Sequence, residues 1–170
     1  MDKQTVLVLE GTDGVGKTEI AKKLSEVLEI PYFKNPDEII KLKWSNLEFK
    51  YRLPDQIYIA SFLKQTRYSA IFDRAYPSEV AYSYAFGRDT DEELLTAIDQ
   101  KFADLGAKII ICFKGAYSNY NDEQIPFDKI GQIFKGYLRF INKTKCDWLL
   151  LETSDEDLKR EIDAILEWLE

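Results

Sequence analysis

A glycine-rich segment near the N-terminus constrains the fold more than any other feature of this sequence. It reads LEGTDGVGKTEI over residues 9–20, follows the apolar run TVLVLE, and leads into a helical pattern over residues 17–28. The chain has only 8 glycines, and three of them lie here, at Gly11, Gly14 and Gly16. Glycine adopts positive φ and lets other groups approach the backbone closely. The segment therefore indicates a loop whose backbone N–H groups surround a ligand where a strand passes into a helix.

The spacing of this segment fits the phosphate-binding pattern G-x-x-x-x-G-K-[ST]. Gly11 and Gly16 take the two glycine positions, and Lys17 and Thr18 complete it. In such loops the lysine reaches the β- and γ-phosphates, and the hydroxyl ligates Mg²⁺. A glycine-rich turn without a ligand is the alternative, but the strand before it and the helix after it favour the phosphate loop. We expect a nucleoside triphosphate to be bound by Gly11, Thr12, Asp13, Gly14, Val15, Gly16, Lys17 and Thr18.

Short apolar runs alternate with helical patterns along the rest of the chain. The runs predicted as strands are 5–10, 69–73, 108–113 and 147–152, with a weaker fifth at 30–34. Their unbroken apolar character is typical of strands buried on both faces of a parallel sheet. Helical spacing covers 17–28, 55–64, 78–86, 91–105, 127–142 and a last helix with Ser154 as its predicted N-cap. We expect one domain over residues 1–170 with a P-loop NTPase α/β fold of three layers, in which helices flank a five-stranded parallel sheet.

The composition excludes several classes of function. The chain has no histidine, so a His-ligated metal or a His-dependent catalytic triad is impossible. Cys112 and Cys146 lack the spacing of a zinc site or a disulfide framework. The formal charge of −7 argues against a broad nucleic-acid surface, although it permits a local basic pocket. Because there is no signal-like N-terminus and no apolar run near the ~20 residues that cross a bilayer, we expect a cytoplasmic protein without a membrane partner.

Two charged residues follow the predicted strand at 69–73. Asp73 closes this strand, where a Walker-B-type carboxylate meets the shell of the Mg²⁺ ion, and Arg74 comes next. An Asp-Arg pair is also typical of an ordinary surface turn, but its combination with a phosphate loop favours a catalytic role. We therefore expect Thr18 and Asp73 to hold the metal, and Lys17, Asp73 and Arg74 to be catalytic.

Two motifs resemble those of the thymidylate kinases. LEGTDGVGKT resembles the phosphate loop of that family, which commonly reads E-G-x-D-G-x-G-K-[ST]. DRAYPSEVAYSYAFGR resembles the family's D-R-Y-x-x-S-x-x-A-Y-Q stretch at Asp73, Arg74, Ser78, Ala81 and Tyr82. The chain is identified on these motifs as a short, divergent member of the thymidylate kinase-like (deoxy)nucleoside monophosphate kinases.

The resemblance implies ATP and Mg²⁺ as cofactors, held by Lys17 and Thr18. It implies that Asp13 senses the 3′-hydroxyl of an acceptor deoxyribose, that Arg74 clamps the phosphates across the transfer axis, and that Tyr82 packs against the acceptor sugar. Ser78 belongs to the same acceptor-side motif.

Further acceptor ligands follow from the same resemblance. The segment YFKNPDE falls where the family has an R-E-P element, so Lys34 replaces the acceptor-phosphate arginine and Pro36 matches. Arg52 is the other candidate for the acceptor phosphate, and Phe49 the candidate that stacks on the base. A surface salt bridge and a core aromatic are the ordinary alternatives for these two residues.

The sequence departs from the family pattern at three places. D-R-Y is D-R-A here, at Ala75, and A-Y-Q is A-Y-S, at Ser83, so the acceptor base is not assigned. The lid candidate, residues 114–126, contains no arginine. Lys114, Lys129 or Arg139 then has to replace a catalytic lid arginine, unless turnover is slow or the chemistry differs.

These observations predict ATP-dependent phosphoryl transfer to a deoxynucleoside monophosphate, dTMP-like, giving the diphosphate in nucleotide biosynthesis. A kinase acting on a hydroxyl, of a deoxynucleoside or of a hydroxymethylated pyrimidine in DNA, stays open as an alternative. Such a kinase needs a general base, and Asn35 stands where deoxynucleoside kinases carry a glutamate, with Asp37 and Glu38 the nearest carboxylates. A non-catalytic nucleotide-gated module is a third hypothesis, and the evidence against it is the joint presence of Lys17, Thr18, Asp73 and Arg74. The expected partners are small nucleotides, and a homodimer is left open.

Overall fold

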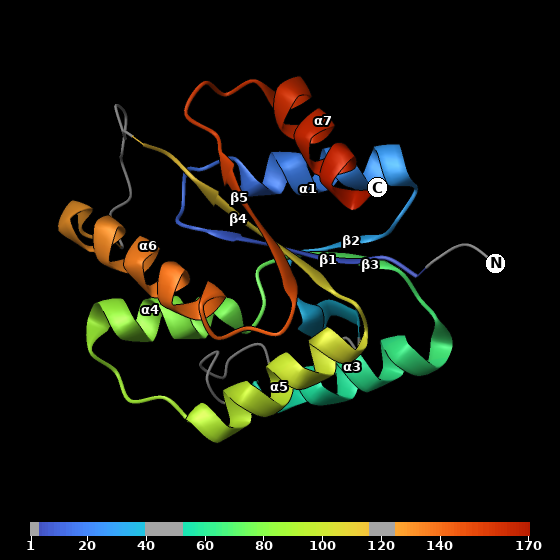
Figure 1. Cartoon of the computed structure of the whole chain (residues 1–170), viewed down its shortest axis with the longest axis horizontal. Coiled ribbons are helices and arrows are strands. Elements are labelled where there is room, and N and C mark those ends of the chain that lie inside the picture. Colours follow the sequence, from blue (N-terminus) through green and yellow to red (C-terminus); the bar gives the residue numbers. More distant parts are fainter. Residues whose placement is uncertain (1–3, 40–52, 116–124) are drawn as a thin grey trace.

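The computed structural model describes residues 4–39, 53–115 and 125–170 (Figure 1). Within them a five-stranded parallel sheet has the order β2-β3-β1-β4-β5. The strands are β1 (Val6–Gly11), β2 (Tyr32–Phe33), β3 (Ala70–Asp73), β4 (Lys108–Phe113) and β5 (Asp147–Glu152). The helices are α1 (Lys17–Leu28), the 3₁₀ helix η1 (Pro36–Ile39), α3 (Asp55–Thr66), α4 (Pro77–Phe86), α5 (Glu92–Asp104), α6 (Phe127–Ile141) and α7 (Leu158–Leu169). The predicted α/β fold is confirmed.

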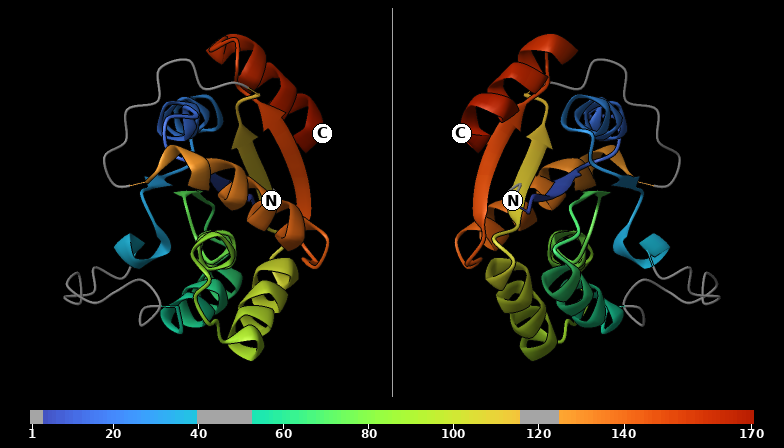
Figure 2. Two further views of the ribbon diagram at one scale, coloured as in Figure 1. Left: turned by 90° about the vertical axis from the view of Figure 1, so that its left-hand side faces the viewer. Right: turned by 90° about the vertical axis from the view of Figure 1, so that its right-hand side faces the viewer.

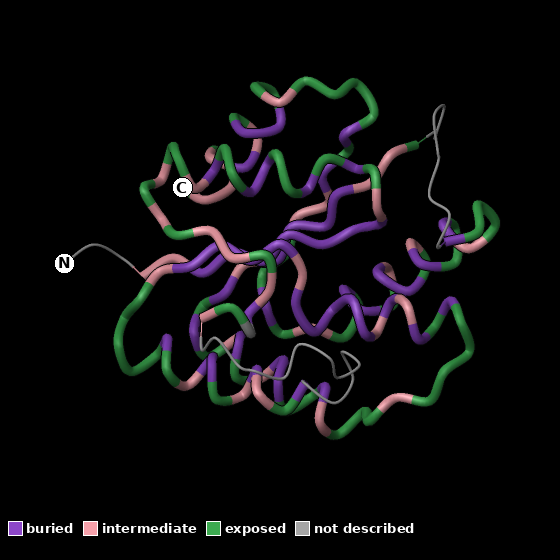
Figure 3. Tube along the Cα trace, turned by 180° about the vertical axis from the view of Figure 1, so that it is seen from behind, coloured by how far each residue is buried: buried purple, intermediate pink, exposed green. Residues whose placement is uncertain are grey.

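Helices cover both faces of the sheet, which gives three layers. Helices α1 and α7 lie on one face, and α3, α4, α5 and α6 lie on the other (Figures 1 and 2). Strand β1 is buried along its whole length because its side chains alternate between the two layers. Leu7 and Leu9 join the core beneath α1 and α7, whereas Val6 and Val8 join the core on the other face. The buried stretches of the chain accordingly gather in the central strands (Figure 3).

The register of the sheet brings the ends of three strands together. Leu9 in β1 is level with Asp73 in β3, and Gly11 is level with Cys112 in β4. Gly11 has a φ of 135°, and a Cβ atom there would lie 2.2 Å from the backbone oxygen of Cys112. Only glycine fits this close approach. The glycine loop and Asp73 therefore emerge at the same edge of the sheet.

Helices α4 and α6 pack closely through Gly136. A Cβ atom at Gly136 would lie 2.6 Å from both the Cα atom and the carbonyl oxygen of Ala81. Because no side chain separates the helices at this point, the neighbouring Tyr137 reaches the end of β1, where its hydroxyl donates to Glu10.

The expected N-cap of the last helix is wrong. The side chain of Asp157 accepts a hydrogen bond from the backbone N of Arg160 and caps α7 at Leu158. The hydroxyl of Ser154 instead accepts from the N–H of Gly115 and donates to Glu152. Ser154 is thus occupied in joining the ends of β4 and β5. Among the residues with described positions, none of the helices combines the length and apolarity needed to cross a membrane.

Candidate active site

The glycine loop places Lys17 at the first position of α1. Gly14 and Gly16 have φ values of 76° and 83°, which L-residues other than glycine rarely adopt. These positions wrap the loop around the N-terminus of α1, and Nζ of Lys17 donates to the carbonyl oxygen of Thr12 at 2.6 Å. Only 6% of Lys17 is exposed. Burial lowers the pKa of the ammonium to about 8, and the nearby Arg74 acts in the same direction. An anion at this site would therefore stabilise a cation that burial disfavours.

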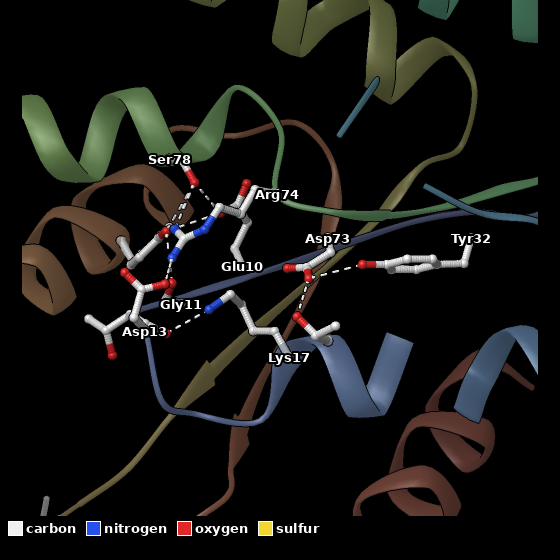
Figure 4. Close-up of polar contacts among 11 residues, drawn as sticks. Glu10, Gly11, Asp13, Lys17, Tyr32, Asp73, Arg74 and Ser78 are labelled. Atoms are coloured by element: carbon white, nitrogen blue, oxygen red, sulfur yellow. Dashed lines mark hydrogen bonds and ion pairs between the residues drawn. The ribbon is translucent and has the colours of Figure 1, made fainter. Parts of the chain in front are cut away.

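Thr18 and Asp73 meet beside this lysine. The Thr18 hydroxyl donates to Oδ2 of Asp73, and the hydroxyl of Tyr32 donates to the same oxygen at 3.3 Å (Figure 4). A hydroxyl and a carboxylate are the hard oxygen donors that suit Mg²⁺. Within the described ranges, no cluster of three potential metal-ligating side chains occurs. The donor set therefore fits an ion that takes its remaining ligands from substrate phosphates and water, as Mg²⁺ commonly does.

Arg74 directs its guanidinium toward the glycine loop. Its Nη2 donates to Oδ1 of Asp13 at 2.6 Å, its Nη1 donates to the hydroxyl of Ser78 at 3.3 Å, and its Cζ lies 5.3 Å from the centre of the Tyr82 ring. The backbone at Arg74 has a φ of 84°, and its N–H donates to the carbonyl oxygen of Leu9 at 2.9 Å. A left-handed backbone at a non-glycine residue is strained, and such strain often accompanies a functional site.

A buried carboxylate, Glu10, lies behind Arg74. It is completely buried and accepts hydrogen bonds from Ala75 N at 2.7 Å, from the Ser78 hydroxyl at 2.6 Å and from the Tyr137 hydroxyl at 3.0 Å. Burial raises the pKa of Glu10, although Arg74 and the hydrogen bonds oppose that rise. Because the Ser78 proton points to Glu10, the Ser78 oxygen is free to accept from Arg74.

The pairing of Glu10 with Tyr137 was not predicted from the sequence. Tyr137 follows the apolar spacing of its helix, which predicts only core packing. The available signal was Glu10 itself, a charged residue that directly follows the apolar run VLVL. Such a residue is seldom buried unless it has hydrogen-bonding partners.

The acceptor-side candidates are only partly brought together. Ser78 and Tyr82, both on α4, lie beside Arg74. The hydroxyl of Tyr82 is buried and has no hydrogen-bond partner among the described residues. Oδ1 of Asn35, just beyond β2, is a second such atom. The side chain of Lys34 is exposed to solvent. Phe49 and Arg52 lie outside the described residues, as do residues 116–124 of the lid candidate.

The three cations that could replace a lid arginine differ in their contacts. Lys129 donates to the carbonyl of Ala85 at 3.1 Å, and Arg139 lies 4.7 Å over the ring of Tyr84. Lys114 forms an ion pair with Glu156 at 2.6 Å and lines a cavity of about 420 Å³ beside the glycine loop. This donor cavity, as we call it, is also lined by Lys17, Thr18, Thr153, Leu158 and Glu161. Lys114 is therefore the one of these three candidates that shares a cavity with the loop.

Comparison with known proteins gives a similarity of fold. No protein-family profile and no curated protein sequence matches the chain. YorR from Bacillus subtilis, solved in complex with phosphorylated GDP, is similar with a TM-score of 0.62 and 20% identity over 96% of both chains. Thymidylate kinase from Ehrlichia chaffeensis is similar with a TM-score of 0.61 and 17% identity over 98% of both chains. Deoxyadenosine kinase from M. mycoides, solved with bound dCTP, has a TM-score of 0.56 and 18% identity over 97% of this chain and 98% of that chain. The chain therefore has the fold found in YorR and in these two nucleotide kinases.

Proposed function

We propose that this chain, as a single domain over residues 1–170, transfers the γ-phosphoryl group of ATP to a small deoxynucleoside monophosphate and gives the diphosphate. The observation that carries the proposal is the position of Arg74. Its guanidinium contacts the glycine loop at Asp13 and lies over the partly buried ring of Tyr82. A cation at this point can contact a donor phosphate at the loop and an acceptor phosphate on the side of α4.

The residues of the site would act mainly by position and charge. Lys17 would hold the donor's terminal phosphates, the N–H groups of the glycine loop would surround them, and Arg74 would neutralise charge that develops during transfer. Thr18 and Asp73 would hold Mg²⁺, which would neutralise negative charge on the phosphates during transfer. No covalent enzyme intermediate is required, because two bound nucleotides held in line supply the reacting atoms.

The acceptor-side residues favour a phosphate over a hydroxyl. A monophosphate oxygen is already anionic and needs only positioning, whereas a hydroxyl acceptor needs a general base. Asn35 follows β2, where such a base would be expected, and its amide cannot accept a proton in this way. The hydroxyl of Tyr82 is buried and has no hydrogen-bond partner among the residues with described positions, so it can bind the acceptor nucleotide.

The test compares each common deoxynucleoside with its own monophosphate as acceptor, with ATP and Mg²⁺ present. Each charge-assisted contact to the acceptor phosphate is worth about 1.5–3 kcal/mol. Two such contacts should raise kcat/KM for the monophosphate by roughly two to four orders of magnitude. A nucleoside, or a hydroxymethylated pyrimidine in DNA, that outperformed every monophosphate would overturn the proposal in favour of a hydroxyl kinase. Absence of transfer to any acceptor would point to the non-catalytic hypothesis.

A further inference from the structure

Glu161 is a buried acid that the phosphate-transfer site does not use. It lies in the first turn of α7, and only 4% of it is exposed. Its Oε1 atom is buried and has no hydrogen-bond partner among the described residues. A helix N-terminus favours a negative charge, which explains an acid in this turn. It does not explain a buried oxygen left unpaired, because such atoms normally have partners.

The unpaired acid belongs to the donor cavity. Glu161 lines this cavity together with Lys17 and Thr18. Thr153, which is also part of the lining, donates a hydrogen bond to the carbonyl of Val15 at 2.9 Å. This hydrogen bond joins the end of β5 to the glycine loop, and the cavity extends from the loop to the start of α7.

The chemistry of a carboxylate limits what it can meet in this cavity. It repels phosphate oxygens, so the triphosphate itself is not its partner. An ionised carboxylate only accepts hydrogen bonds, and the neutral part of a nucleotide offers donors in the base amino group and the sugar hydroxyls.

We propose that Glu161 selects the phosphate donor by accepting a hydrogen bond from its nucleoside, through a base amino group or a sugar hydroxyl. This inference rests on the proposed function, since it assumes that the donor cavity binds a nucleoside triphosphate. Burial raises the pKa of the Glu161 carboxyl, because water no longer solvates its charge. A donor hydrogen from the nucleotide would replace the missing water.

The experiment measures equilibrium binding of ATP and of three analogues that each lack one hydrogen-bond donor, with no acceptor present. Purine riboside triphosphate lacks the base amino group, 2′-deoxyATP lacks the 2′-hydroxyl, and 3′-deoxyATP lacks the 3′-hydroxyl. One of the three should bind roughly 10- to 100-fold more weakly than ATP, because a hydrogen bond to a charged group is lost. The analogue that binds more weakly than ATP identifies the nucleotide group that donates a hydrogen bond to Glu161.

Glu161→Leu replaces the carboxylate, which would accept the hydrogen bond, with an apolar side chain of similar size. This variant should lose the same factor in ATP affinity and should bind ATP and the weakened analogue alike. Its melting temperature should be equal or higher without ligand, because a buried oxygen atom without a hydrogen-bond partner has been removed. Glu167→Gln, an exposed site on the same helix, is the control and should bind like the wild type. If the Leu variant does not fold, Glu161→Gln provides the test. Its amide oxygen still accepts a hydrogen bond but carries no charge, so the difference in affinity between ATP and the same analogue should become smaller.

Wild-type protein that binds all three analogues as tightly as ATP would overturn the inference. So would a folded Leu variant that still discriminates among them, and so would a Gln variant with unchanged discrimination when the Leu variant does not fold. If the protein discriminates between ATP and an analogue in binding but transfers no phosphoryl group to any acceptor, only the proposed function would be contradicted. Transfer without discrimination would contradict only the role of Glu161.

Discussion

Gly136 provides a sharp test of how the two helices beneath the site are held together. Replacing it with alanine would place a Cβ atom 2.6 Å from the Cα atom and the carbonyl oxygen of Ala81. These are backbone atoms, so no side chain can rotate away and the helices must separate. Such overpacking costs up to about 3 kcal/mol, and the better helix propensity of alanine returns about 1 kcal/mol. We expect a net loss of about 2 kcal/mol in the free energy of unfolding.

Gly131 offers the matched control because it lies in the same helix, α6, and a Cβ atom added there would have nothing within 4 Å. Gly131→Ala should therefore gain about 1 kcal/mol from helix propensity alone. In a chain of this size, 1 kcal/mol shifts the melting temperature by about 2–4 °C. The two variants should thus move in opposite directions, with Gly136→Ala lower by about 4–8 °C and Gly131→Ala higher by about 2–4 °C.

Thermal denaturation followed by circular dichroism measures both shifts, and a turnover assay completes the test. Separation of the helices would withdraw the Tyr137 hydroxyl from Glu10, so Gly136→Ala should also lose activity, whereas Gly131→Ala should keep it. Equal stabilisation by the two substitutions would refute the reasoning, because it would mean that α4 and α6 are not in contact at Gly136.

Three further substitutions test the site itself. Lys17→Ala should lower turnover by at least about 100-fold, since the ammonium acts on the transferred charge, while thermal melts should show no loss of stability because a desolvated cation has been removed. Asp13→Ala should reduce the preference for deoxyribonucleotide over ribonucleotide acceptors by roughly tenfold in kcat/KM, and an unaltered preference would contradict a role in reading the sugar. Glu10 has a pKa raised above 4.5, so the folded chain keeps this proton at pH values where the unfolded chain has lost it, and the contribution of Glu10 to the free energy of unfolding falls as the pH rises through that window. Urea titrations from pH 4.5 to 7 should show a flatter dependence in Glu10→Gln than in the wild type.

The strands and the glycine loop could be predicted because their signals are local. The run KIIICF is apolar from Ile109 onward, and the strand observed there, Lys108–Phe113, has the predicted bounds. Strand β2 is shorter than the predicted 30–34, because only Tyr32 and Phe33 pair with β3. Both side chains are only partly buried, so an edge position gives the weak sequence signal that was seen.

Capping could not be settled from the sequence, because Ser154 and Asp157 are both suitable N-cap residues. The decision depends on Gly115, which is 39 positions away along the chain and occupies the Ser154 hydroxyl. The same limit applies to the partners of Glu10, since Tyr137 comes from a helix 127 positions later. Apolar periodicity predicts which face of a helix is buried, but it does not report which buried hydroxyl meets which carboxylate.

The roles of Asp13, Tyr82 and Lys34 came from resemblance and stay predictions. The structure nonetheless separates them by position. Asp13 and Tyr82 both contact Arg74, whereas the side chain of Lys34 is exposed beyond β2. The local pattern around Lys34 gave no information on this difference, because the direction of a side chain after a short edge strand depends on the loop that follows it.

The loop contacts described here are made by the protein's own atoms. The Lys17 ammonium is bonded to the carbonyl of Thr12, the Thr18 hydroxyl to Asp73, and the Arg74 guanidinium to Asp13. An incoming nucleotide must exchange with these internal partners, so its affinity is smaller than the sum of its new contacts would suggest. The same partners are available again at the moment the product departs. Competition from within the chain would thus keep both substrate and product loosely held, which favours rapid release where release limits turnover.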